Sequence, residues 1–217
     1  MPSPPSPPSA PAGSSAPPLA LTPDPLSPRP PGAATALILG GARSGKSARA
    51  LALADGFAAG DGPAGASGRV FVATAEPFDD ELAERVARHR VERGDTWRTV
   101  EAPLELPEAI RAARARASVV VVDCLTVWLG NLMHRERDVG AATAALLESL
   151  DARPGESPEG PAAAPLVLVS NEVGLGLVPE TPLGRRFRDE QGRLNREVAA
   201  RSTRVEFVAA GLPLRLK

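Results

Sequence analysis

The chain has 217 residues, with 25 basic and 26 acidic side chains and a formal net charge of −1. This balance argues against a protein held on nucleic acid by bulk charge, so we expect no nucleic-acid partner. A single cysteine excludes an intramolecular disulfide framework, and no apolar run is long enough to cross a bilayer, so we expect a cytoplasmic protein without a membrane span.

Residues 1–34 form a distinct N-terminal segment that contains 13 of the 24 prolines and almost no large apolar side chains. Such a segment cannot bury enough apolar surface to offset the entropy lost on ordering, which predicts a disordered tail with polyproline II character. A spacer, or a start codon placed too far upstream, is favoured over a docking segment, because the tail carries no specific motif. Residues 35–217 are long enough for one domain with its own core.

Apolar and amphipathic patterns alternate along residues 35–217. Short apolar runs predict buried strands, and longer periodic stretches predict helices. In chain order these patterns predict a strand at Ala36–Leu39, a helix from Lys46 to about Ala59, a strand at Arg69–Ala73, a helix from Asp79 to about Arg93, a strand at Thr96–Val100, a helix at Glu105–Ala117, a strand at Ser118–Val122, a helix over 126–150, a surface loop over 151–164, a strand at Leu166–Val169, a helix at Leu183–Arg201, a strand at Arg204–Val208 and a short tail strand at 213–217. The alternation predicts an α/β fold with a doubly wound, mostly parallel sheet.

A glycine-rich string, GGARSGKS, joins the first predicted strand to the first predicted helix and matches the P-loop pattern G-x-x-x-x-G-K-[ST]. Glycines let successive N–H groups curl around an anion, and the helix places its positive dipole end at the same point. A turn that merely joins strand to helix is the alternative, but the chain's sole internal lysine lies at the motif's lysine position, which favours nucleotide binding. The string predicts a P-loop NTPase-like fold with a nucleotide site at Gly40, Gly41, Ala42, Arg43, Ser44, Gly45, Lys46 and Ser47.

Asp123 directly follows the valine run of the most apolar predicted strand. A carboxylate at the end of a strand near a P-loop helps to hold Mg²⁺, so we expect Asp123 and the hydroxyl of Ser47 to bind this metal. The alternative role is to cap the next helix, a common use of aspartate. The pattern alone leaves an ATPase, a kinase and a switch GTPase open.

His89 lies on the predicted helix over 79–93, three residues after Val86 and among several arginines. A neutral imidazole beside guanidinium groups is suited to attack a phosphorus while the arginines hold phosphate oxygens. From these residues alone, a half-buried core histidine is the favoured interpretation. The second histidine, His134, is interpreted as a surface residue.

Several segments together carry a resemblance to a known family. They are Gly40–Ser47, Ala73–Glu76, Arg85-x-x-x-His89-Arg90 followed by Trp97-Arg98-Thr99, Asn171–Glu180, Phe187-Arg188-Asp189, and Gly192-Arg193-x-Asn195, and they span about residues 36–217 in order. They resemble the bifunctional adenosylcobinamide kinase/adenosylcobinamide-phosphate guanylyltransferase of cobalamin assembly. The Pro-rich tail has no counterpart in the family pattern, and some members carry glutamate where this chain has Asp123.

The resemblance implies an enzyme with two steps and with ATP and GTP as substrates. A nucleoside triphosphate phosphorylates adenosylcobinamide, and GMP then passes from GTP through a guanylyl-histidine to adenosylcobinamide phosphate, giving adenosylcobinamide-GDP. It implies that His89 is the guanylylated residue, which reverses the interpretation from the residues alone, and that the enzyme is a homotrimer with sites at subunit contacts. The family's nucleotide contacts match Gly40–Ser47, Thr74, Ala75, Glu76, Arg90, Val91, Glu92, Arg93, Glu101 and Asp123.

Two other function classes share the P-loop. A small-molecule kinase without a covalent step would use the same loop but would give His89 no role. A regulatory GTP-binding module usually reads guanine through Asn-Lys-x-Asp, and that motif is absent because lysine occurs only at positions 46 and 217.

Overall fold

The computed structural model describes residues 34–58, 68–76, 96–151 and 163–217. The predicted tail lies outside the described residues except for Ala34, and the predicted helix over 79–93 lies wholly outside them. The other predicted strands and helices fall within the described ranges.

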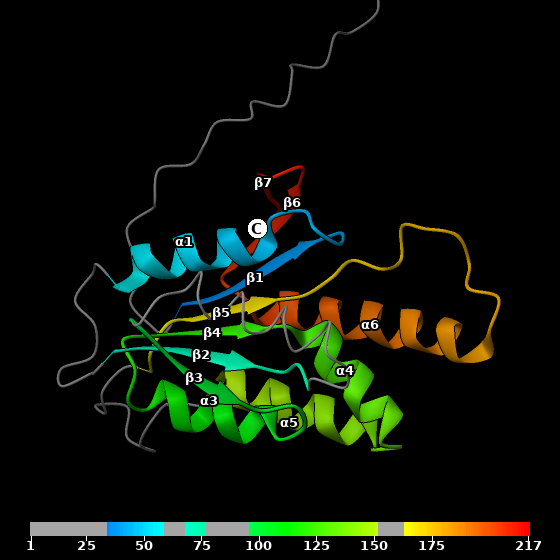
Figure 1. Ribbon diagram of the computed structural model, residues 1–217, viewed down its shortest axis with the longest axis horizontal. Helices are drawn as coiled ribbons and strands as arrows, with labels where there is room; N and C mark the ends of the chain where they lie inside the picture. Colours follow the sequence, from blue (N-terminus) through cyan, green and yellow to red (C-terminus); the bar gives the residue numbers. More distant parts are fainter. Residues whose placement is uncertain (1–33, 59–67, 77–95, 152–162) are drawn as a thin grey trace, which may run out of the picture.

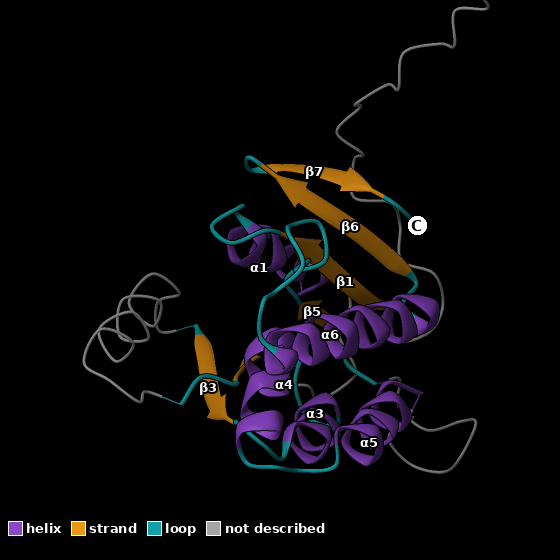
Figure 2. Cartoon of the chain, turned by 90° about the vertical axis from the view of Figure 1, so that its right-hand side faces the viewer, coloured by secondary structure: helices purple, strands orange, loops and turns teal. Residues whose placement is uncertain are grey.

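Seven strands form one sheet in the order β3-β2-β4-β5-β1-β6-β7 (Figures 1 and 2). Every neighbouring pair is parallel except β6 and β7, which form an antiparallel hairpin. This arrangement confirms the predicted doubly wound, mostly parallel sheet. The strands are β1 (Thr35–Gly40), β2 (Arg69–Ala73), β3 (Trp97–Glu101), β4 (Val119–Asp123), β5 (Leu166–Val169), β6 (Arg204–Ala209) and β7 (Leu212–Arg215).

Helices cover both faces of the sheet, as Figure 1 shows for α1 on one side and α3 and α5 on the other. Alternate residues of a strand point to opposite faces of the sheet, so the apolar strands contribute side chains to two hydrophobic cores. One core lies under α1, where Ile38 and Val121 pack with Leu53, and the other packs Leu37 and Val120 against α3 to α6. The helices are α1 (Lys46–Ala58), α3 (Leu106–Arg114), α4 (Leu125–His134), α5 (Val139–Asp151) and α6 (Pro182–Arg201).

The prediction of one helix over 126–150 is wrong, because α4 and α5 are separate helices. Glu136 lies between them with φ 52°, in the left-handed region that a continuous helix cannot contain. The N–H of Arg137 donates to the carbonyl of Leu132 at 2.9 Å, which closes the end of α4. The carboxylate of Asp138 then accepts a hydrogen bond at 3.0 Å from a first-turn N–H of α5.

Of the surface loop predicted over 151–164, Asp151 is instead the last residue of α5, and residues 152–162 lie outside the described ranges. None of the helices in the described part of the chain combines the length and apolar character needed to cross a bilayer. Because β1 to β6 run parallel, their carboxyl ends share one edge of the sheet, and ligands of open α/β sheets bind at this edge.

Candidate nucleotide-binding site

The loop between β1 and α1 is tightly packed against the end of β6. Gly40 has φ 151°, and a Cβ there would lie 2.3 Å from the carbonyl oxygen of Val208. Gly45 has φ 98°, and a Cβ there would lie 3.3 Å from the Cα of Gly211. The N–H of Gly211 also donates to the carbonyl of Ser44 at 2.9 Å. The β6–β7 hairpin therefore packs against the loop, and this close packing explains why both positions are glycine.

Lys46 is the first residue of α1 and is only 7% exposed. Its amine donates a hydrogen bond to the carbonyl of Gly41 within the loop. Burial lowers the pKa of Lys46, while the nearby Cys124 and Asp123 act in the opposite direction. The first turn of α1 holds no acidic residue, so the helix N-terminus and the lysine together present positive potential at the loop.

Ser44 adds a buried polar group to the loop. Its Oγ is buried and makes no hydrogen bond within the described residues. A buried polar atom without a partner is destabilising, and phosphate oxygens accept hydrogen bonds from hydroxyl groups. The loop thus combines a buried amine, an unsatisfied hydroxyl and a helix N-terminus, a combination suited to a phosphate group.

The predicted pair Ser47 and Asp123 meets in the structure. The Oγ of Ser47 donates a hydrogen bond to Oδ2 of Asp123 at 2.6 Å. The capping alternative for Asp123 is wrong, because Cys124 rather than Asp123 is the N-cap residue of α4. The described residues contain no group of three or more His, Cys, Asp or Glu side chains able to hold a metal. One hydroxyl and one carboxylate fit Mg²⁺, which takes most of its ligands from water and phosphate.

Thr74 lies directly beside Asp123 and is fully buried. Its hydroxyl bonds with the backbone N–H and carbonyl of Cys124, at 2.9 and 2.8 Å. The Thr74 side chain therefore holds the end of β4 in place. Of its two neighbours in the predicted contact set, Ala75 follows it along the edge, and Glu76 forms an ion pair with Arg135 at 2.8 Å.

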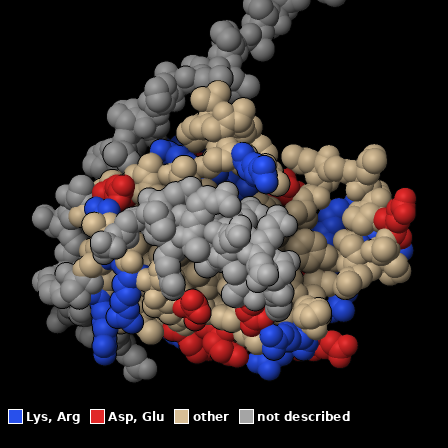
Figure 3. Space-filling model, viewed as in Figure 1, with Lys and Arg blue, Asp and Glu red and all other residues tan. Residues whose placement is uncertain are grey.

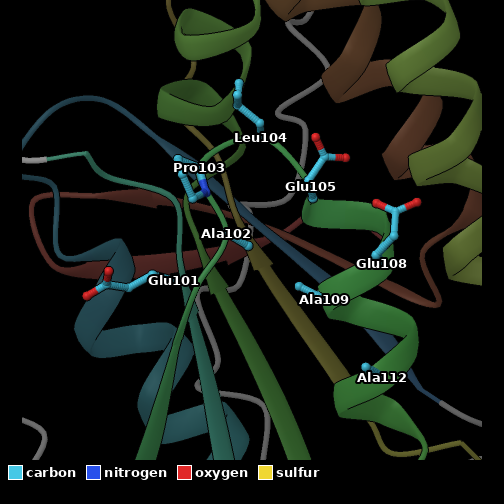
Figure 4. Close-up of a pocket in the computed structure, with 8 residues that line it drawn as sticks. All are labelled: Glu101, Ala102, Pro103, Leu104, Glu105, Glu108, Ala109 and Ala112. Carbon is cyan, nitrogen blue, oxygen red and sulfur yellow. The ribbon is translucent and has the colours of Figure 1, made fainter.

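Glu101 ends β3 at the outer part of the same edge and lines a shallow pocket of about 490 Å³. Figure 4 shows Glu105 and Glu108 on one side of this pocket and Glu101 on the other, with Pro103 and Leu104 between them and the Glu101 carboxylate pointing away from the other two. Acidic side chains also gather over the end of β3 and α3 in the space-filling view (Figure 3). The pocket offers carboxylate acceptors beside an apolar surface, which suits a flat group carrying N–H donors.

The segment after β5 was not among the predicted site residues, yet it adjoins the P-loop. The N–H of Glu172 donates to the carbonyl of Gly40 at 3.0 Å. The signal that identified Asp123 also applies here, because Ser170, Asn171 and Glu172 are polar residues that directly follow an apolar strand.

The remaining predicted site residues lie outside the described ranges. They are the predicted guanylylated residue His89 and the predicted nucleotide contacts Arg90, Val91, Glu92 and Arg93. The structure therefore places Gly40–Ser47, Thr74–Glu76 and Asp123 at one edge of the sheet, with Glu101 farther along the same edge at the end of β3, and for the other five it gives no position.

Comparisons with known proteins identify the family. Residues 36–216 match the family described as "CobU: Cobinamide kinase / cobinamide phosphate guanyltransferase". The chain is 43% identical over 183 residues to the bifunctional adenosylcobalamin biosynthesis protein CobP of Pseudomonas aeruginosa, covering 83% of this chain and 96% of that protein. It is 38% identical over 192 residues to the protein of the same description, CobU, of Escherichia coli, covering 83% and 98%. The corresponding CobU of Salmonella typhimurium is 35% identical over 189 residues, again with 83% and 98% covered.

The chain belongs to the cobinamide kinase / cobinamide phosphate guanyltransferase family, as the resemblance seen in the sequence indicated.

Proposed function

We propose that this family member catalyses two consecutive reactions of cobalamin biosynthesis. In the first, ATP or GTP gives its γ-phosphoryl group to the hydroxyl of adenosylcobinamide. In the second, GMP moves from GTP through a histidine to adenosylcobinamide phosphate, and adenosylcobinamide-GDP is the product. Family membership over residues 36–216 supports both reactions.

The arrangement of groups at the phosphate-binding loop is the main support for this proposal. Three groups meet at one loop on the carboxyl edge of the sheet: a buried lysine amine, the N-terminus of α1, and a Ser44 hydroxyl that has no hydrogen-bond partner among the described residues. These groups hold the β- and γ-phosphates of the nucleotide and stabilise charge that builds up during transfer.

Ser47 and Asp123 are the residues that would hold Mg²⁺ beside those phosphates. Their 2.6 Å hydrogen bond keeps a hydroxyl and a carboxylate oxygen together before any metal arrives. When bound, the metal neutralises phosphate charge and so assists the departure of the leaving group. Lys46, whose amine donates to the carbonyl of Gly41 within the loop, supplies a second positive charge.

His89 is the proposed carrier of GMP. Its imidazole attacks the α-phosphorus of GTP, the bond to the α–β bridging oxygen breaks, and pyrophosphate leaves. The phosphoramidate is high in energy, so the GMP group can pass on to the phosphate of the second substrate. Arg90 directly follows His89 in the sequence and Arg93 lies four residues after it, and guanidinium groups suit phosphate oxygens.

Glu101 is the proposed contact to the guanine base. Guanine carries adjacent N–H donors on one edge, and a carboxylate accepts both in a bidentate pair. The pocket beside Glu101 adds an apolar surface from Pro103 and Leu104, against which a flat ring packs. Thr74, Ala75 and Glu76 lie between this pocket and Asp123 along the same edge.

We also propose that the protein is a cytoplasmic homotrimer. Four large apolar side chains near the start of α6 are exposed to solvent: Leu175 by 81%, Leu177 by 96%, Val178 by 62% and Leu183 by 65%. Several exposed apolar side chains within one short segment are typical of a contact between subunits. Sedimentation equilibrium tests the state directly, and a monomer at micromolar concentration would contradict it.

Mass spectrometry of the full chain after incubation with GTP and Mg²⁺ tests the covalent step. We expect one added GMP on a peptide that contains His89, and an acid-labile label from GTP carrying ³²P at the α-phosphate. His89→Asn should lose the label while GTP binding persists. His134→Asn is the matched control and should retain the label.

Product analysis separates the two-step enzyme from the alternatives. The proposed enzyme releases pyrophosphate when adenosylcobinamide phosphate and GTP are supplied, and forms adenosylcobinamide phosphate from adenosylcobinamide and a triphosphate. A kinase without a covalent step releases only ADP or GDP, and a regulatory GTP module turns over neither corrinoid. Either of those outcomes would reject the proposal.

A further inference from the structure

We propose that Glu172 is the general base of the kinase step, the group that accepts the proton of the substrate hydroxyl. This inference rests on the proposed kinase activity and adds a residue to that same site. It follows from the position of Glu172 beside the P-loop, from the way its backbone is fixed, and from the availability of its carboxylate.

Glu172 lies next to the phosphate-binding loop because β5 pairs directly with β1. The chain leaves β5 alongside the loop that leaves β1 (Figure 1). At that point the N–H of Ser170 donates to the carbonyl of Ile38 at 3.0 Å, and the N–H of Glu172 donates to the carbonyl of Gly40 at 3.0 Å. The sheet ladder therefore continues past the end of β5 and attaches Glu172 to the first residue of the P-loop.

A buried polar network fixes the two residues before Glu172. The Oγ of Ser170 donates to Oδ1 of Asn195 at 2.6 Å, and the amide of Asn195 donates to the carbonyl of Asn171 at 3.0 Å. The N–H of Asn171 donates to the hydroxyl of Thr126 at 2.7 Å. Helices α4 and α6 thus hold this segment from two sides, so Glu172 starts from a rigid position, as a catalytic group requires.

Among the described residues, one hydrogen bond holds the carboxylate of Glu172. Oε1 accepts a hydrogen bond from the N–H of Gly174 at 2.6 Å, and Oε2 makes no hydrogen bond within the described residues. A Cβ on Gly174 would lie 2.8 Å from Oε1, so the glycine permits this close approach. The side chain is partly exposed, which leaves Oε2 accessible to a substrate hydroxyl.

The other carboxylates along this edge are either engaged or far from the P-loop. Asp123 accepts from Ser47, and Glu76 is paired with Arg135. Glu101 ends β3, which lies four strands away from β1 in the sheet order. Among the described carboxylates at this edge, Glu172 alone combines a hydrogen bond to the P-loop backbone with an oxygen that makes no hydrogen bond to the described residues.

In the proposed step, each bond that forms is matched by a bond that breaks. The hydroxyl oxygen of adenosylcobinamide forms a bond to the γ-phosphorus, and the bond from that phosphorus to the β–γ bridging oxygen breaks. The hydroxyl proton moves to Oε2 of Glu172, and the nucleoside diphosphate leaves with the bond's electron pair. The protonated carboxyl later releases its proton to solvent. General-base assistance of this kind contributes about 10²–10⁴-fold in rate.

The variant Glu172→Gln tests the proposal because glutamine retains an acceptor oxygen for the N–H of Gly174. We expect the kinase kcat to fall by about 100-fold or more, with GTP affinity by calorimetry unchanged. GMP transfer to supplied adenosylcobinamide phosphate should also stay near the wild-type rate. The acidic limb of the kinase pH–rate profile should disappear, and Glu172→Asp should recover part of the rate.

Glu180→Gln is the matched control, since Glu180 is an exposed glutamate in the same loop, and it should leave both reactions unchanged. A kinase rate within threefold of wild type in Glu172→Gln would overturn the role. A parallel loss of GTP affinity and GMP transfer would also overturn it, because it would reveal a structural role only. If the wild-type protein itself lacks kinase activity, the proposed function fails, and this inference fails with it.

Discussion

The hydroxyl of Ser47 donates a hydrogen bond to Oδ2 of Asp123 at 2.6 Å, although 76 residues separate the two in the chain. The bond joins the first turn of α1 to the end of β4, across the intervening strand β5. It places a hydroxyl and a carboxylate together beside the P-loop. The sequence pattern predicted both residues as ligands of one magnesium ion, which requires them to lie close together.

Asp123→Asn tests the role of this pair. The asparagine oxygen can still accept from Ser47, so we expect the melting temperature of the nucleotide-free protein to change by less than about 2 °C. The charge that attracts Mg²⁺ is lost, so transfer rates should fall by about 100-fold and the magnesium concentration for half-maximal rate should rise. Asp151→Asn, at an exposed ion pair on α5, is the control and should alter neither quantity. An unchanged magnesium dependence in Asp123→Asn would remove it from the metal site.

Lys46→Ala should weaken nucleotide binding. Loss of one charge-assisted hydrogen bond to phosphate costs about 2 kcal/mol, which raises the Kd for GTP roughly 30-fold. Calorimetry with GTP measures this directly. Lys217→Ala removes the other lysine, whose amine bonds to the last carbonyls of α6, and should leave the Kd unchanged. Equal affinities in wild type and Lys46→Ala would contradict the phosphate-binding role.

Gly40→Ala should destabilise the protein or displace the P-loop. The added methyl would lie 2.3 Å from the carbonyl oxygen of Val208, a contact that requires backbone movement. We expect a loss of about 2–3 kcal/mol in the free energy of unfolding, measured by chemical denaturation, and weaker GTP binding. Gly192→Ala is the control: it meets no atom within 4 Å in α6 and should stabilise the protein by about 0.5–1 kcal/mol. Similar effects of the two substitutions would contradict the packing argument.

Glu206 ties the first turn of α1 to the sheet through ion pairs with Arg49 at 2.7 Å and with Arg204. Burial alone would raise the pKa of Glu206, but the hydrogen bonds and charges of the two arginines outweigh it and lower the pKa below its usual 4.5. The group therefore contributes stability at pH values above 4.5, and this contribution disappears as the pH falls below 4.5 toward the lowered value.

Glu206→Gln should lower the free energy of unfolding at neutral pH by about 2–3 kcal/mol, because it leaves Arg204 buried without its counter-charge. The stability difference between variant and wild type should shrink as the pH is lowered below 4.5. Urea denaturation across this range measures both effects. A pH-independent difference would show that the ion pairs contribute nothing specific. Glu108→Gln, in an exposed pair with Arg111, is a control for which we expect less than about 0.5 kcal/mol.

Local patterns predicted most of the elements. Leu166–Val169 and Arg69–Ala73 were predicted with the bounds the structure gives, since short apolar runs between turn residues have one favourable environment. The break between α4 and α5 was missed because Arg135 to Asp138 fit a solvated helix face as well as a turn. The left-handed conformation of Glu136, which the structure alone shows, marks this segment as a turn.

The sequence by itself determined the phosphate-binding loop, because glycine spacing, an adjoining apolar strand and a lysine at one position are local features. It also determined the family. The tertiary structure alone decided that β5 lies between β1 and β4, and hence that Glu172 adjoins the P-loop while Asp123 reaches it through Ser47. Strand order depends on which distant segments pair after their helical crossovers, and a list of strands does not contain that information.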